Sequence, residues 1–271
     1  MITPITSPLV AVSIQPTQRE AVARAASPVA HVKFIDACEL DSLLERHEAA
    51  VGFVVEVSVA KEAAFDAAIC CAHRARPTTP IIAYVTDHEE SAQLFVHAVR
   101  AGANHVALYG VIDLGGAVGD ALAPSLKQPV CAEATHRALP WIPPLAHPVI
   151  TYCAMNAQQR PTVSVTAEAL RMSARSLYRL FHDLALPTPE ATIGWCRLFV
   201  AAQMAALEKP IKEIATTLGF GSGSAFHDML RRYAGLTSTA LRDSSAVARL
   251  AQSYSSVVAA SASSSELPKL G

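Results

Sequence analysis

Hydrophobic residues in positions 8–122 alternate between short continuous runs and longer segments with helical spacing. The short runs are rich in β-branched residues and predict five strands: Leu9–Ile14, Val32–Ile35, Val51–Val57, Ile81–Val85 and His105–Leu108. The longer segments predict five helices: Pro16–Ala26, Glu39–His47, Glu62–His73, Glu90–Ala101 and Leu114–Leu122. Continuous apolar strands between amphipathic helices are typical of a parallel sheet covered on both faces. We therefore predict a doubly wound, five-stranded α/β domain over residues 1–123.

The pattern changes at a cluster of prolines between residues 123 and 148. Such a density rules out a continuous helix from the sequence alone and predicts an extended, semi-stiff linker, placed at residues 124–147. Helical spacing then returns and predicts an all-α domain over 148–243, a bundle of about seven helices. The last segment, 244–271, is rich in Ser and Ala. We expect it to be disordered, although a short helix over 247–258 also fits its spacing.

Two segments of the all-α domain have the pattern of a helix-turn-helix unit. In the first, residues 164–170 lead through a three-residue corner to a helix over 174–184, with Ser173 as its N-cap. In the second, an amphipathic helix that starts at Pro210 stops at Gly219, and Ser222 caps a helix over 223–233. The second helix of such a unit enters the major groove of DNA. The sequence therefore predicts a protein that binds double-stranded DNA sequence-specifically.

An apolar helix over residues 189–207 separates the two units. The eighteen residues that follow Pro189 span about 27 Å at about 1.5 Å per residue of helix. Adjacent major-groove faces on one side of a duplex lie about 34 Å apart. A rigid spacer of this length is suited to holding two DNA-reading helices against the same side of a duplex.

Candidate contact residues lie on the second helix of each unit, away from its apolar stripe. Arg175, two residues beyond its cap, is placed to pair with O6 and N7 of guanine. Arg231 and Arg232 suit phosphate oxygens or the C-terminal end of the helix dipole, and a solvated surface role is an equal alternative for both. The candidate DNA-binding residues are Arg175, Tyr178, Arg179, Gly223, Ser224, His227, Asp228, Arg231 and Arg232.

Residues 172–181 and 211–220, followed by Ser222, Ser224, Phe226 and Gly235-Leu236-Thr237, resemble the DNA-binding domain of AraC/XylS-type bacterial transcription regulators. The resemblance covers roughly residues 148–242. It implies DNA contacts from Arg175, Tyr178 and Arg179 in the first unit, and from Gly223, Ser224, His227 and Asp228 in the second.

Three residues depart from this family's pattern. Arg171 stands in the first corner, where glycine is usual, and Gly223 stands where a long polar side chain is common. Asp228 replaces a frequent arginine and brings a carboxylate near DNA. These departures predict that the second unit binds weakly, or that it reads the amino groups of cytosine instead.

The first domain resembles the receiver domain of bacterial response regulators in residues 79–85 and 98–106, its fourth and fifth strands and the turn between them. The residues that carry phosphoryl chemistry in that family do not carry over. No carboxylate lies near Ser13-Ile14-Gln15, where an acidic pair would hold Mg²⁺, and Tyr109 stands for the lysine after the fifth strand. The serine or threonine that follows the fourth strand in that family corresponds to Val85 or Thr86. We therefore expect a receiver-like domain that does not accept a phosphoryl group.

Glu56 occupies the position that corresponds to the phosphoacceptor aspartate. One interpretation is a fixed negative charge that imitates a phosphorylated aspartate and holds the domain in one state. The other, which we favour from the sequence, is a solvated side chain at a strand end in a pocket that has lost its function. The domain then serves for homodimerisation, or for binding a small-molecule or protein effector at the carboxyl ends of the strands.

Composition adds limits to this picture. Residues 1–144 carry a net charge of −5 and residues 145–243 one of +3, so only the second region is suited to approaching phosphate. The six cysteines form no CxxC pair, so we predict neither a metal site nor a disulfide framework, and no cofactor. Cys70 and Cys71 have the helical spacing of small buried residues. With no signal peptide and no membrane-spanning run, we expect a cytoplasmic protein.

Together these features predict a transcription regulator that uses two recognition helices and is not an enzyme, since no catalytic motif is present. Two alternatives stay open. The first is a protein-interaction module in which DNA contact is vestigial. The second is a ligand-binding or catalytic α/β domain fused to a DNA reader.

Overall fold

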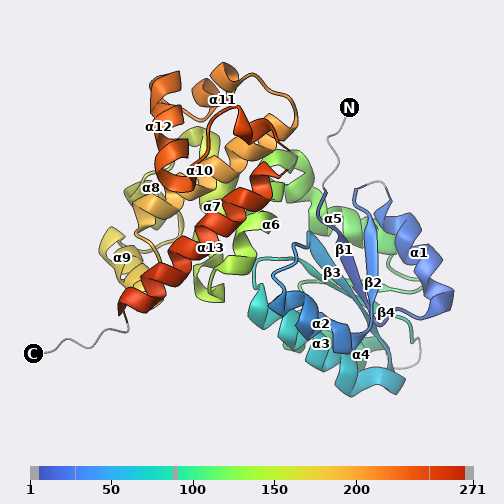
Figure 1. Ribbon diagram of the computed structural model, residues 1–271. Helices are drawn as coiled ribbons and strands as arrows, with labels where there is room; N and C mark the ends of the chain where they lie inside the picture. The colour runs from blue at the N-terminus through green and yellow to red at the C-terminus, as the bar shows by residue number, and fades with distance from the viewer. Residues whose placement is uncertain (1–5, 28, 88–90, 244, 266–271) are drawn as a thin grey trace, which may run out of the picture. The chain divides into compact units, whose positions relative to one another are not determined.

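The computed structural model describes residues 6–27, 29–87, 91–243 and 245–265. The chain divides into two compact units, residues 1–136 and 137–271. The first unit is an α/β domain and the second is helical (Figure 1). This confirms the fold class predicted from the sequence.

The first unit contains one parallel sheet of five strands in the order β2-β1-β3-β4-β5. This is the order of flavodoxin-like doubly wound folds. The strands are β1 (Leu9–Val12), β2 (Val32–Ile35), β3 (Gly52–Val57), β4 (Ile81–Val85) and β5 (His105–Leu108). All residues of the central strands β1, β3 and β4 are buried, which explains why their sequences are apolar apart from Glu56 of β3.

Helices cover both faces of this sheet (Figure 1). Helices α1 and α5 pack on one face, over a core that includes Leu9, Val54 and Val118. Helices α2, α3 and α4 pack on the other face, over a core that includes Val55, Ile69 and Leu94. Their bounds are α1 (Pro16–Ala26), α2 (Ala37–Glu45), α3 (Glu62–Ala75), α4 (Ser91–Ala101) and α5 (Leu114–Lys127), with the short 3-10 helix η1 (Val59–Lys61) before α3.

The extended linker predicted for residues 124–147 is wrong. Helix α5 continues through Pro124 to Lys127, α6 follows at Pro129–Ala138, and two 3-10 helices follow, η2 (Leu139–Trp141) and η3 (Pro144–Ala146). Pro129 and Pro144 each begin a helix, where the missing N–H of proline costs no intrahelical hydrogen bond. Pro124 lies inside α5 and these two prolines begin helices, so the proline density does not prevent helix formation in this region.

The second unit is built around helix α10 (Pro189–Ala206), which is buried over most of its surface. The preceding elements are α7 (His147–Met155), η4 (Ala157–Gln159), α8 (Val163–Ala169) and α9 (Ala174–Asp183). The following ones are α11 (Ile211–Thr217), α12 (Gly223–Ala234), η5 (Ala240–Arg242) and α13 (Ala246–Ser265). Helices α7, α8, α9, α11 and α13 all contact α10. The central helix is thus the common support of the unit.

The expectation of a disordered tail over 244–271 is also wrong for its described part, because α13 is a helix of 20 residues. Ala246, Leu250 and Tyr254 recur at intervals of four residues and are buried. This stripe packs on α10 and α12. The Ser- and Ala-rich composition suggested disorder, but a helix needs only one apolar stripe to dock when a neighbouring apolar helix offers a surface.

Candidate nucleic-acid interface

The pairs α8–α9 and α11–α12, here called the first head and the second head, turn through corners with the same hydrogen bonds. In the first corner the N–H of Met172 donates to the carbonyl of Ala167 (2.9 Å), and Arg171 has a φ of 55°. In the second, the N–H of Phe220 donates to the carbonyl of Ala215 (2.8 Å), and Gly219 has a φ of 70°. Both are Schellman-type helix ends with a left-handed residue. The corner therefore forces Arg171 into a backbone conformation that glycine adopts at lower cost.

The second helix of each head begins at a serine cap, as the sequence predicted. The N–H of Ser176 donates to Oγ of Ser173 (3.0 Å), and the N–H of Ala225 donates to Oγ of Ser222 (3.1 Å). Leu177 and Phe181 of α9 are buried, as are Phe226 and Leu230 of α12. The buried stripe fixes the rotation of each helix and so determines which residues face outward.

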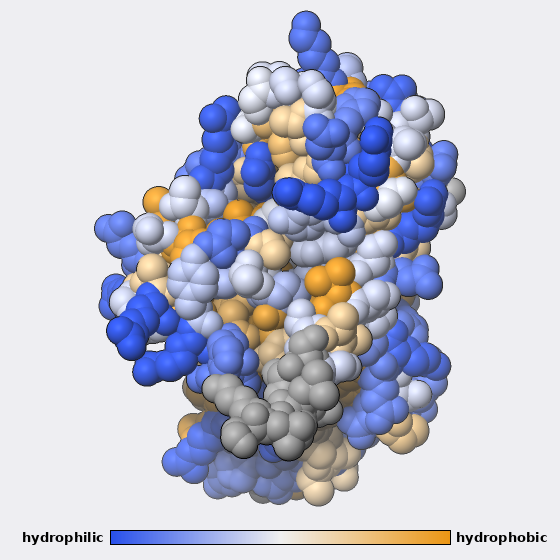
Figure 2. Space-filling view, turned by 60° about the vertical axis from the view of Figure 1, so that its left-hand side comes forward, coloured by the Kyte–Doolittle hydropathy of each residue, from blue (hydrophilic) through white to orange (hydrophobic). Residues whose placement is uncertain are grey.

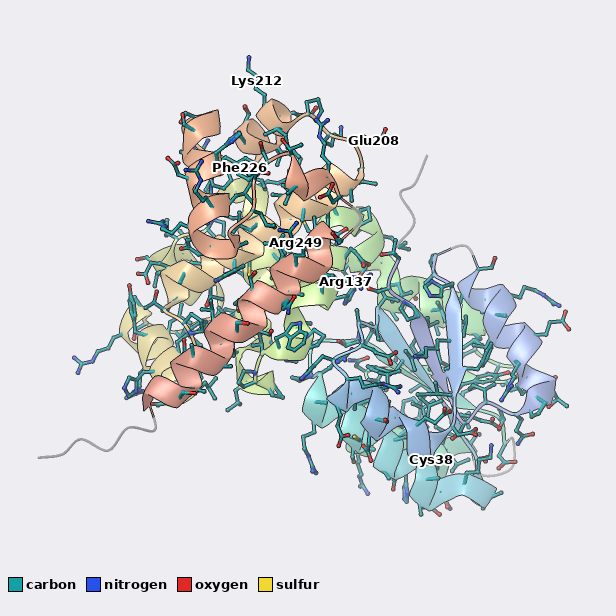
Figure 3. All side chains as sticks on the ribbon, viewed as in Figure 1. Cys38, Arg137, Glu208, Lys212, Phe226 and Arg249 are labelled. Atoms are coloured by element: carbon teal, nitrogen blue, oxygen red, sulfur yellow. The ribbon has the colours of Figure 1, made fainter. Side chains whose placement is uncertain are left out.

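The polar residues that the sequence selected on these helices all face solvent. Figure 2 turns this side of the unit forward and shows hydrophilic residues along its upper and left edges, with apolar residues between them. In Figure 3, Lys212 of α11 points away from the unit and Phe226 points into it. The exposed candidates are Arg175, Tyr178, Arg179, Gly223, Ser224, His227, Asp228, Arg231 and Arg232.

Tyr178 has a partner inside the unit. Its hydroxyl donates a short hydrogen bond to Oε1 of Glu190, in the first turn of α10. This hydrogen bond raises the pKa of Tyr178 and lowers the pKa of Glu190. The pair borders a cleft of about 440 Å³ between the start of α8, α9 and the start of α10. Tyr178 is thus tied to the central helix, and its ring, 44% exposed, is the part that stays accessible.

The exposed start of α12 offers fewer groups for strong contacts with DNA than that of α9. His227 Nδ1 lies 3.4 Å from Oγ of Ser238, and the guanidinium of Arg232 lies 5.4 Å from the ring centre of Tyr233. A β-carbon on Gly223 would meet no other atom within 4 Å, so this position is open and carries no side chain. In the described residues the outward start of α12 offers one imidazole, one hydroxyl and one carboxylate.

Two arginines in this unit were not singled out from the sequence. Arg197 lies on α10, and its guanidinium donates to the carbonyl of Leu218, the last residue before the second corner (2.7 Å). Arg160 lies at the end of η4 and contacts Gly219 in the same corner. A sequence signal for Arg197 existed, since it is the one charged residue in the mostly apolar segment 191–206.

Glu56 is not the solvated side chain that we favoured from the sequence. It is completely buried, and its Oε2 accepts a hydrogen bond from the N–H of Gln15 (2.6 Å). Its Oε1 lies 3.3 Å from the Thr86 hydroxyl, and its Oε2 lies 3.6 Å from Nζ of Lys61. A carboxylate without such partners would be costly to bury. The sequence had pointed to Thr86 as one of two candidates, whereas Lys61 in η1 was missed.

Cys70 is exposed, which corrects the expectation that both adjacent thiols are buried. Cys71 is half-buried, and its thiol donates to Oδ1 of Asp41 (2.8 Å). Burial, and then the bond to Asp41, raise the pKa of Cys71 to about 11. A thiol with this pKa is protonated at neutral pH and is a poor nucleophile.

No group of three or more His, Cys, Asp or Glu side chains in the described residues is placed to hold a metal ion. Among the helices that the structure describes, none has the length and apolar character needed to cross a membrane.

Comparison with known proteins bears on the helical unit. Residues 166–244 match the family described as "Helix-turn-helix domain", which is of AraC type. The chain is 39% identical over 77 residues to the "RCS-specific HTH-type transcriptional activator RclR" of Escherichia coli (strain K12), a stretch that covers 28% of this chain. The chain spans about a quarter (27%) of that relative's length.

A solved structure of the "xylose-binding transcription activator xylR" is also similar, at 15% sequence identity and with a TM-score of 0.37. The match covers 88% of this chain and 70% of that chain.

The geometry and the family match together define the class of the second unit: it is a helix-turn-helix DNA-binding domain. The family match lies in the segment that contains residues 172–181 and 211–220, and it agrees with the resemblance of this unit to the DNA-binding domain of AraC-type regulators.

Proposed function

We propose that this protein is a transcription regulator that reads two successive major-groove faces of double-stranded DNA, one with α9 and one with α12. The observation that carries the proposal is the repeated construction of the two heads. Each has the same corner, a serine-capped second helix and an outward polar surface, and both rest on α10. Recognition helices present their N-terminal residues to base edges in this arrangement.

The two heads contribute unequally in this proposal. Arg175 and Arg179 give α9 two exposed cations, and guanidinium groups pair with guanine or phosphate. On α12 the N-terminal turns carry Asp228 and no side chain at Gly223. Its two exposed arginines, Arg231 and Arg232, lie in the last turn, away from the end that presents residues to base edges. The first head therefore supplies most of the affinity, and the second head refines the choice of site.

The α/β unit serves for homodimerisation or effector sensing and not for phosphoryl transfer. Both carboxylate oxygens of Glu56 already face donors, which supports the interpretation that a permanent charge stands where a phosphorylated aspartate would be. Exposed apolar residues on α4, among them Phe95 and Val99, support association. A cleft of about 550 Å³ bordered by Tyr84, Tyr109 and the start of α5 supports the binding of an effector.

The first test is selection of bound duplexes from a random DNA pool with the full-length protein. Two enriched blocks about one helical turn apart are the expected result. Affinity for the selected duplex should fall steeply with salt, because phosphate contacts release counterions. Failure to enrich any sequence would reject the proposal and favour the protein-interaction module.

The α/β unit can be tested in the same full-length protein. Incubation with acetyl phosphate and Mg²⁺ should leave its intact mass unchanged, and a phosphorylated product would contradict the role given to Glu56. A thermal-shift screen of metabolites tests effector binding, since a ligand of the folded state raises its melting temperature.

A further inference from the structure

The second corner is held by a contact from the central helix that is unlike an ordinary surface interaction. Arg197 projects from α10, and its guanidinium nitrogen lies 2.7 Å from the carbonyl oxygen of Leu218. That carbonyl lies at the C-terminal end of α11, where the helix dipole favours a positive charge. The same guanidinium lies 4.1 Å from the ring centre of Phe220, within the range of a cation–π interaction.

Phe220, which Arg197 contacts, also contacts the recognition helix α12. Its ring centre lies 4.9 Å from that of Phe226, a completely buried residue of α12. The path from α10 to α12 is therefore Arg197, Phe220 and Phe226, three planar groups in direct contact. Such groups have few rotatable bonds, so they transmit position better than flexible side chains.

A second arginine reaches the same corner from the chain that leads into the first head. Arg160 has a left-handed backbone (φ 55°) and directly precedes Pro161 and the N-cap Thr162 of α8. The outer atoms of the Arg160 side chain lie against Gly219, where a β-carbon would push them aside, and the φ of 70° at Gly219 favours glycine. The corner of the second head is thus in contact with α10 on one side and with the entry to the first head on the other.

From these contacts we infer that Arg197 is a positioning residue that fixes the second head relative to the first. Burial and the nearby cation of Arg160 lower the pKa of this arginine. Arg197 contacts no DNA in this role. It determines which spacing and rotation between two sequence blocks the protein accepts. This inference rests on the proposed two-headed reading of DNA, and it names the side chain that makes the two heads act as one rigid reader.

The variant to test is Arg197→Met in the full-length protein, which keeps a long side chain and loses the hydrogen bond and the charge. Arg249→Met is the matched control, because Arg249 is an exposed residue of α13 and its loss changes the net charge equally. Arg197→Lys keeps the charge and loses the planar group. If Arg197→Met does not fold, the lysine variant carries the test.

The first readout is affinity for a series of duplexes in which the distance between the two selected blocks changes by one base pair at a time. One base pair rotates the second block by about 34–36° around the duplex axis. Wild type and Arg249→Met should lose about tenfold in affinity at the wrong spacing, comparable to one mismatched base pair. The affinity of Arg197→Met should vary by less than about threefold across the spacing series. Its affinity for the best two-block duplex should exceed its affinity for a duplex with the first block alone by no more than about tenfold. Arg197→Lys should fall between them.

The second readout needs no DNA. Backbone amide hydrogen exchange around residues 218–223 should be faster in Arg197→Met than in wild type, while exchange in α9 stays unchanged. Wild-type spacing dependence together with unchanged exchange in Arg197→Met and Arg197→Lys would overturn the inference. If the wild-type protein selects no two-block site, the proposed function fails. The exchange measurement then still tests the corner: faster exchange in Arg197→Met shows that Arg197 holds it, and unchanged exchange shows that it does not.

Discussion

Replacing Tyr254 by alanine should strongly destabilise the helical unit, although Tyr254 lies in a Ser- and Ala-rich segment beyond the matched helix-turn-helix residues. The ring is 1% exposed and packs between two aromatic residues of α10. Its centre lies 5.2 Å from that of Trp195 and 5.7 Å from that of Phe199. Removing a large buried ring costs about 3–5 kcal/mol, because the cavity is only partly refilled. The contacts with the two rings of α10, about 0.5–1.5 kcal/mol per pair, are part of this cost.

The assay is denaturant unfolding followed by the fluorescence of Trp195, in a Trp141→Phe background so that only one tryptophan reports. Tyr254→Ala should lower the free energy of unfolding by about 3–5 kcal/mol. Tyr254→Phe retains the ring and should change it by less than about 1.5 kcal/mol. Gln252→Ala, an exposed position on the same helix, should stay within about 0.5 kcal/mol of wild type. Equal unfolding midpoints for Tyr254→Ala and Gln252→Ala would refute the docking of α13 on α10.

Three further changes test the interface and the α/β unit. Arg175→Ala should cost about 1–3 kcal/mol of specific binding and relax selectivity at one base position, and unchanged selectivity in the binding assay would reject its role as a base contact. Arg171→Gly should raise the free energy of unfolding by about 0.5–1 kcal/mol, because a left-handed arginine is strained and glycine is not; a lower thermal midpoint would contradict this. Cys71 should react with iodoacetamide slowly at pH 8 and faster as the pH rises towards about 11, where half of its thiol is ionised. Full alkylation of Cys71 at pH 7 would show that its thiol is not held protonated.

Much of the architecture follows from local patterns in the sequence. The predicted bounds of β2, β4 and β5 agree with the structure, because short β-branched runs between turns have few alternatives. Both serine caps were identified, since a cap satisfies helix N–H groups within three residues and leaves a local trace.

The features that could not be predicted from the sequence depend on contacts that form only in the folded chain, mostly between separate segments. Lys61 reaches Glu56 because η1 follows β3 closely, but a lysine five residues after a glutamate is not a specific signal. The docking of α13 depends on the apolar surface of α10, about 50 residues earlier in the chain. The outward direction of the nine candidate residues could be predicted from periodicity, whereas the bond between Tyr178 and Glu190 depends on how α9 meets α10.

The departures from the family pattern and the contacts of Arg197 lead to one expectation about how the two heads share their work. The first head has exposed cations in the first turns of α9 but a strained corner at Arg171. The second head has a glycine at its corner, a carboxylate near the start of α12 and its exposed arginines only in the last turn of that helix. A weak reading helix contributes selectivity only when its position is fixed, because otherwise it can avoid an unfavourable base by moving. The contacts of Arg197 with Leu218 and Phe220 supply that fixed position. Loss of Arg175 should therefore reduce affinity for every duplex that carries the first block, whereas loss of Arg197 should mainly reduce discrimination between spacings.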